Sequence, residues 1–432
     1  MSEIKKIGSY RWTICALIFF ATTVNYLDRQ VIGILKPLLE SDLNIGEKAY
    51  SHIIMAFQLF YALGMVISGR LVDKFGTRLG YGISVFFWSI AAMGHAFAKG
   101  VVGFGFWRGL LGLSESGNFP AAIKAVAEWF PKKERALATG IFNSGTNVGA
   151  IAAPLAVPAI IFTWGWQAAF IITGSIGFIW LILWFIFYEI PEKHKKLKAS
   201  ELAYINSDED EKTDTKEHIP WTTLLKYRQT WLFFIGKGLT DPIWWFYLFW
   251  IPGWLAEVRG TGLNIGTFGL PLAFIYSATT VGSIGGGWIS SIMIKRGITP
   301  FNARKYTMLI FAFLVTPIAF AASPSVSTWG AVCLIALAAS SHQAWSANLF
   351  TTVSDAFPKK AVSSVTGIGG TAGALCGAFI SYIAGGILEH FKKLGNIESG
   401  YVVIFSIAAS AYLLAWIIMT VFAPKVKKVV MD

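Results

Sequence analysis

Long apolar stretches recur along the chain and are separated by short polar or charged gaps. Each stretch is close to the roughly 20 residues that an α-helix needs to cross a membrane. A more polar segment lies at the middle of the sequence, over 191–228. The pattern predicts twelve membrane-spanning helices, over 12–37, 50–70, 79–98, 101–129, 136–162, 166–190, 230–256, 266–294, 305–323, 328–356, 361–389 and 399–423.

Two short motifs occur twice at the same separation. The sequence FPKK stands at 130–133 and again at 357–360, and TGI stands at 139–141 and again at 366–368. Both pairs are 227 residues apart (357 − 130 and 366 − 139). Parallel repeats of this kind build the two halves of many transporters. We therefore expect an all-α integral membrane protein of two pseudo-symmetric six-helix bundles, divided into 1–190, a cytoplasmic linker at 191–228, and 229–432.

Composition excludes a soluble protein. Of the 432 residues, 55% are hydrophobic and only 14% are charged, against roughly 25% charged in soluble domains. The formal net charge of +12 comes from basic residues gathered in alternate gaps, which predicts that both termini are cytoplasmic. This explanation leaves no reason to expect nucleic acid as a partner.

The segment at 69–78, GRLVDKFGTR, lies between the second and third predicted helices. It resembles the G-x-L-x-D-(R/K)-x-G-x-(R/K) signature of the major facilitator superfamily. The resemblance implies two bundles that rock about a central site, and it gives the signature residues a gating role. Those residues are Gly69, Asp73, Lys74, Gly76 and Arg78.

Further motifs are similar to the anion:cation symporter family within that superfamily. They are NYLDR at 25–29, QLFYALG at 58–64, RGLLG at 108–112 with NFP at 118–120, and WSANLF at 345–350. The last motif is most similar to the hexuronate-transporter branch. The resemblance implies that the protein carries an organic anion with protons or sodium, in a bacterial inner membrane.

Two adjacent charges, Asp28 and Arg29, lie well inside the first predicted helix. A charge costs roughly 2.5–3.5 kcal/mol at a membrane centre, so it needs a function or a partner. Arg29 can hold a carboxylate through two parallel N–H donors, and Asn25 lies one turn away on its face. We expect Arg29 to bind the substrate carboxylate, although structural pairing with other helices is an alternative.

The fourth predicted helix carries Arg108 and Glu115, two turns apart on one face. We expect Arg108 to pair with Asp28 and Glu115 to be left to exchange a proton, so that Asp28 and Glu115 serve proton coupling. The alternative is a Glu115 carboxyl satisfied permanently by Asn118 or by backbone. The repeat places His342 opposite Glu115, where an ordinary hydrogen-bonded histidine is the simpler interpretation.

Several neutral polar or aromatic residues also lie within predicted spans. We expect them to line the substrate site, although packing is a strong alternative for the aromatic ones; they are Tyr61, Asn147, Gln343, Trp345, Asn348 and Thr371. Lys237 and Asp241 are four residues apart and can neutralise each other. We therefore interpret that pair as structural.

The chain contains no recognisable nucleophile–base pair, metal-ligand cluster or phosphate loop. The sequence therefore predicts a transporter and not an enzyme, with no cofactor apart from a coupling ion, H+ or alternatively Na+. We expect a monomer that imports a sugar-acid anion, such as galacturonate or glucuronate, by proton symport. The alternative is a carrier or exchanger of another anion, such as galactonate or a dicarboxylate.

Overall fold

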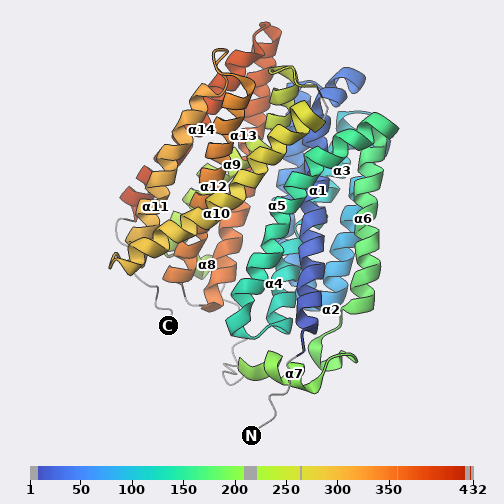
Figure 1. Ribbon diagram of the computed structural model, residues 1–432, viewed down its shortest axis with the longest axis vertical. Coiled ribbons are helices and arrows are strands. Elements are labelled where there is room, and N and C mark those ends of the chain that lie inside the picture. The colour runs from blue at the N-terminus through green and yellow to red at the C-terminus, as the bar shows by residue number, and fades with distance from the viewer. Residues whose placement is uncertain (1–7, 209–220, 263–264, 358, 424–428, 430–432) are drawn as a thin grey trace.

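The computed structural model describes residues 8–208, 221–262, 265–357, 359–423 and 429. Helices make up almost all of this part of the chain and run side by side in two bundles (Figure 1). The first bundle contains α1 (Tyr10–Leu43), α2 (Glu47–Gly94), α3 (Val101–Glu115), α4 (Asn118–Trp129), α5 (Lys132–Trp164) and α6 (Trp166–Phe187). The second contains α9 (Arg228–Glu257), α10 (Leu270–Lys295), α11 (Pro300–Val315), α12 (Thr328–Ala356), α13 (Lys359–Lys393) and α14 (Ile397–Phe422).

Helix α2 spans the membrane twice and so accounts for two of the predicted helices. Gly76 interrupts its helical conformation with φ 78° and ψ 162°. A residue other than glycine is strained at such a positive φ, so this position allows the chain to turn sharply between the two spans. Conversely, α3 and α4 form one span whose helical hydrogen bonding is interrupted at Ser116 and Gly117, although both residues keep helical φ and ψ. With these two adjustments the predicted twelve spans are confirmed.

The repeat predicted from the sequence is visible in the helix boundaries. Helix α4 ends at Trp129 and α5 begins at Lys132, while α12 ends at Ala356 and α13 begins at Lys359. Both boundaries are separated by 227 residues (356 − 129 and 359 − 132). The two halves therefore break and restart their helices at equivalent positions.

Apolarity alone identifies only part of this architecture. Seven segments of the described chain are long and apolar enough to cross a membrane by composition. Other spans, such as α1, contain charged side chains that lower their apolarity. Asp28 and Arg29 are 2% and 3% exposed, so these charges point into the protein and not toward lipid.

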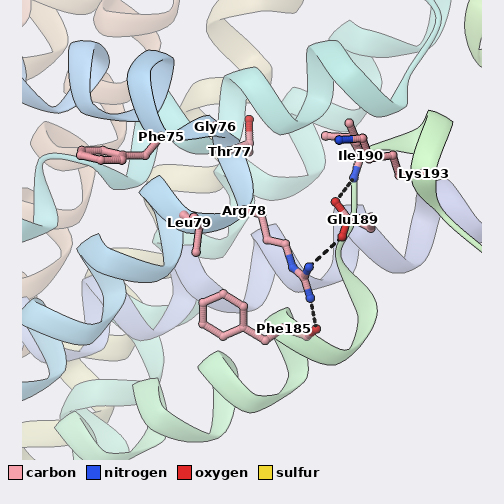
Figure 2. Close-up of a pocket in the computed structure, with 9 residues that line it drawn as sticks. All are labelled: Phe75, Gly76, Thr77, Arg78, Leu79, Phe185, Glu189, Ile190 and Lys193. Carbon is pink, nitrogen blue, oxygen red and sulfur yellow. Dashed lines mark hydrogen bonds and ion pairs between the residues drawn. The ribbon is translucent and has the colours of Figure 1, made fainter.

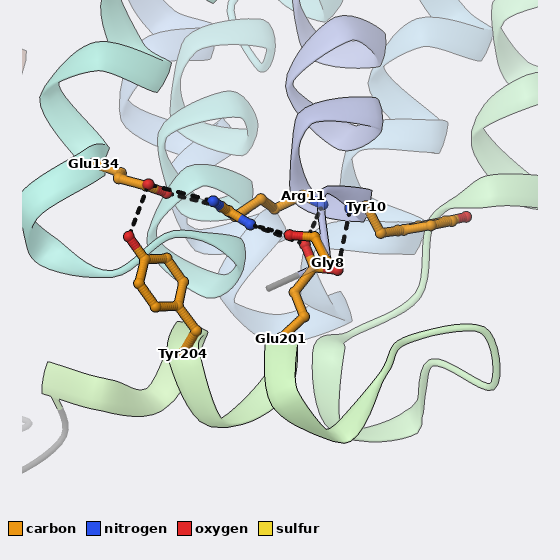
Figure 3. Close-up of polar contacts among 6 residues, drawn as sticks. All are labelled: Gly8, Tyr10, Arg11, Glu134, Glu201 and Tyr204. Carbon is orange, nitrogen blue, oxygen red and sulfur yellow. Dashed lines mark hydrogen bonds and ion pairs between the residues drawn. The ribbon is translucent and has the colours of Figure 1, made fainter. Parts of the chain in front are cut away.

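The linker between the bundles begins with a short helix, α7 (Ala199–Ile205). It packs beneath the first bundle, at the lower end of Figure 1, where α1 begins. Arg11 of α1 contacts Glu134 of α5 at 2.8 Å and Glu201 of α7 at 3.1 Å, and Tyr204 of α7 donates to Glu134 at 2.8 Å (Figure 3). Glu201 also accepts from the backbone N–H of Tyr10. This cluster, which we call the α7 clasp, ties the linker to the first bundle.

Candidate functional site

The guanidinium of Arg29 lies inside the first bundle, in an ion pair with Glu115. Nε and Nη2 of Arg29 donate to Oε2 of Glu115 at 3.0 and 2.8 Å, and Nη2 also donates to Oδ1 of Asn25 at 3.1 Å. Glu115 is 1% exposed. The edge of the guanidinium formed by Nε and Nη2 is therefore occupied by Glu115.

Aromatic rings surround the same guanidinium. Its carbon lies 4.7 Å from the ring centroid of Tyr26, 5.2 Å from Phe57, 5.1 Å from Tyr61 and 5.3 Å from Trp245. Tyr26 and Tyr61 remain partly exposed. Trp245 belongs to α9, so the ring of contacts joins the two bundles. The structure thus brings Arg29, Asn25 and Tyr61 together as predicted, and it adds Tyr26, Phe57 and Trp245.

The ion pairing differs from the expectation. Arg108 donates through Nη2 to the backbone oxygen of Arg29 at 3.0 Å, and its Nε and Nη1 have no partner among the described residues. Both carboxylate oxygens of Asp28 are likewise without a hydrogen-bond partner. The predicted Arg108–Asp28 pair is therefore not formed here, and Glu115 is not the free carboxyl. Adjacent residues of a helix point about 100° apart, so Arg29 reaches Glu115 while Asp28 points elsewhere.

The other residues predicted to contact the substrate differ in their partners and in their exposure. Asn147 of α5 donates to Thr280 of α10 at 3.0 Å, so its amide connects the two bundles. Asn348 donates to the backbone of its own helix, whereas Gln343 and Thr371 are partly exposed. Trp345 is fully buried and packs edge-on against Tyr412 of α14, as in the packing alternative for the aromatic residues.

The second bundle has a charged pair of its own. Nζ of Lys237 lies 2.6 Å from Oδ2 of Asp241, one turn along α9. Nearby, Nδ1 of His342 lies 2.7 Å from the hydroxyl of Tyr412, and its ring stacks on Trp244 at 5.1 Å. His342 is therefore hydrogen-bonded and stacked.

The signature segment lies at the turn of α2. Arg78 contacts Glu189 at 2.7 Å and donates to the backbone oxygen of Phe185 at 2.8 Å (Figure 2). A cavity of about 590 Å³ opens here, with Gly76 and Arg78 in its wall. Lys74 is exposed beside Phe75. Gly69 and Asp73 lie in α2 before this turn, and their contacts lie outside what the structure describes.

A buried ionic network at the opposite end of the bundles is absent from the sequence prediction. Lys36 of α1 contacts Glu47 of α2 at 2.5 Å and Glu257 of α9 at 2.7 Å, and Lys392 of α13 contacts Glu40 and Glu257. We call these five residues the far-end network. Lys36 is 1% exposed, and a lysine at the end of an apolar helix was its only signal in the sequence. The network holds the two bundles together at this end.

Comparisons with known proteins agree with this architecture. The sequence profile of the Major Facilitator Superfamily matches residues 18–381. The chain belongs to the major facilitator superfamily. In structure it is similar to a bacterial homologue of the human lysosomal transporter Spinster, with a TM-score of 0.76, 17% identity and coverage of 96% and 97% of the two chains. It is also similar to a D-xylose–proton symporter, with a TM-score of 0.75, 16% identity and coverage of 98% and 100%.

Curated relatives within this superfamily are closer in sequence. The chain is 31% identical to the hexuronate transporter of Escherichia coli (strain K12) over 394 residues, which cover 89% of each protein. It is 33% identical to the galacturonate transporter of Dickeya chrysanthemi over 316 residues, which cover 72% of this chain and 90% of the relative. The resemblance to the hexuronate branch is thereby confirmed. The chain is an integral membrane transporter and not an enzyme.

Proposed function

We propose that this transporter imports a hexuronate anion, such as galacturonate or glucuronate, by proton symport with alternating access. One observation carries the proposal: Glu115 occupies the edge of Arg29 that a substrate carboxylate would use. Protonation removes the negative charge of Glu115 and with it the ion pair, so the guanidinium of Arg29 can bind the anion. Proton binding and anion binding are thus coupled through one side chain.

Charge balance supports this coupling. The Arg29–Glu115 pair is neutral in the empty site, and adding one proton and one monovalent anion leaves it neutral. A neutral loaded site can be enclosed between the two bundles at a smaller electrostatic cost than a charged one. Asp28 is a second proton-accepting candidate, because its carboxylate is buried in α1 and forms no ion pair among the described residues.

Orientation and coupling ion are part of the proposal. The basic residues of the gaps support a cytoplasmic position for both termini, and the matched relatives named above are bacterial, in keeping with an inner-membrane location. We take the functional unit to be a monomer, because each chain contains both bundles. The coupling ion is H+ and no cofactor takes part.

The test is uptake of labelled galacturonate into proteoliposomes, with a proton gradient or a sodium gradient imposed singly. Accumulation driven by the proton gradient alone is expected. Arg29→Lys keeps the charge but loses the paired N–H donors, and we expect its apparent affinity to fall by about tenfold or more. Arg259→Lys is the matched control, because within the described part of the chain Arg259 donates to backbone oxygens alone, those of Ala321, Ser323 and Val326.

A second candidate is a carrier or exchanger of another sugar acid. It is favoured by similarity to a D-galactonate transporter of Escherichia coli O6:H1, at 28% identity, and to a probable galactarate/D-glucarate transporter of Escherichia coli (strain K12), at 31%. Galactonate or galactarate accumulating in place of galacturonate would support it. Accumulation driven by sodium alone would contradict proton symport for any of these anions.

A further inference from the structure

The Lys237–Asp241 pair lies where α9 packs between α12 and α13. Nζ of Lys237 also lies 4.5 Å from the ring centroid of Phe350 in α12. The side chains of Lys237 and Asp241 keep 9% and 16% exposure. Charged atoms on an inner helix keep such exposure toward a water-accessible interior, because lipid contact is unfavourable for them.

Helix α13 carries glycines at every fourth position where it meets this face of α9. A Cβ on Gly373 would lie 2.5 Å from Oδ2 of Asp241, and one on Gly369 would lie 2.2 Å from the ring of Phe233. Asp241 therefore occupies space that a side chain of α13 would otherwise fill. Because these glycines of α13 have no side chains, the charged groups of α9 can extend into the space between the two helices.

The pair is also close to the Arg29 site. Trp245, which contacts the Arg29 guanidinium, lies one turn after Asp241 and two turns after Lys237 on the same face of α9. At 1.5 Å per residue these turns are about 6 and 12 Å along the helix. A pyranose ring held by its carboxylate at Arg29 would extend past Trp245 toward Asp241.

The chemistry of the pair differs from that of a second anion site. Because Lys237 and Asp241 neutralise each other, they offer a strong donor and a strong acceptor without net charge. Neutral hydroxyl groups both donate and accept hydrogen bonds, and they match such a pair better than a second carboxylate does. We propose that Lys237 and Asp241 bind the hydroxyl groups at the end of the sugar acid remote from its carboxylate. This inference rests on the proposed function, because it assumes a sugar-acid substrate.

The decisive variant is the double substitution Lys237→Met with Asp241→Asn, which removes both charges and leaves no buried unpaired ion. A purely structural ion pair tolerates such a replacement. Binding of D-galacturonate to the purified full-length protein is measured by calorimetry, and folding is checked by thermal unfolding. We expect a folded protein whose Kd for D-galacturonate is at least tenfold weaker. Its affinity for the 4-epimer glucuronate, which differs only at the hydroxyl next to the carbon that bears the carboxylate, should fall to a similar degree.

The matched control is Lys393→Met with Glu389→Gln, an i,i+4 pair at 3.3 Å in which Lys393 is largely exposed. This control should bind like the wild type. Wild-type affinity in a folded Lys237/Asp241 double variant would overturn the inference while leaving the proposed function intact. A wild-type protein that binds neither uronate would overturn both.

A second measurement does not depend on any variant folding. Cyclohexanecarboxylate has the same ring size and carboxylate but no hydroxyl groups. A site built to hydrogen-bond hydroxyls rejects an analogue that lacks them, so we expect it to compete at least a hundredfold less well than galacturonate. Equal competition by the two compounds would contradict hydroxyl recognition.

Discussion

Arg29 and Glu115 are 86 residues apart in the chain, and the guanidinium of one holds the carboxylate of the other at 2.8 Å. Both side chains are almost completely buried. Removing one partner of such a pair leaves an uncompensated charge, whereas neutralising the acid by a proton does not change its shape. The proposed coupling therefore assigns two states to the pair, one with Glu115 ionised and bound to Arg29 and one with Glu115 protonated and Arg29 released.

Glu115→Gln mimics the protonated state. We expect it to abolish accumulation driven by a proton gradient while leaving exchange of labelled for unlabelled substrate within a few fold of wild type. Gradient-driven uptake and counterflow in the same proteoliposomes measure the two activities. Loss of both, or of neither, would count against a coupling role for Glu115.

The far-end network predicts a conformational effect of Lys36→Met. This change removes the cation that joins Glu47 of the first bundle to Glu257 of the second. The bundles should then separate more often at this end, which broadens and lengthens the distance between spin labels at the exposed positions Asp42 and Leu394. Lys48→Met, at an exposed position of α2, should leave the distances unchanged. Identical distributions for both variants would show that the network does not hold this end together.

Helix α13 offers a matched pair of glycine substitutions. Gly373→Ala places a methyl group 2.5 Å from Asp241, and overpacking of this kind costs about 1–3 kcal/mol. Its apparent melting temperature should fall. Gly386→Ala lies on the same helix with open space around the new methyl group, so its melting temperature should stay equal or rise slightly. A reversed order of the two values would contradict the close packing of α9 and α13.

The α7 clasp predicts a local effect of Arg11→Met. Without the guanidinium, Glu134 and Glu201 lose their shared cation, and α7 should detach more often from α1. Hydrogen exchange over 199–205 should accelerate by about tenfold, which corresponds to roughly 1.4 kcal/mol. Lys196→Met, an exposed position before α7, is the control. Unchanged exchange in Arg11→Met would mean that the linker is held by other contacts.

The sequence predicted the elements well because lipid imposes a simple length and polarity rule on each span. It misjudged one partner between helices. Arg108 was expected at Asp28, but its guanidinium donates to the backbone oxygen of Arg29. Hydrophobic periodicity identifies the faces of each helix and not the height and rotation at which two helices pack.

By itself, the sequence determined the twelve spans, the 227-residue repeat and the presence of charges that lipid would not tolerate. Helical periodicity fixes which residues of one helix share a face, and so Asn25 was correctly placed beside Arg29. Only the tertiary structure decided that Arg29 holds Glu115, that Lys36 joins the bundles, and that Asp241 fills the space beside Gly373. These contacts join helices distant in the chain, and their geometry depends on how the helices cross and bend, which no single helix specifies.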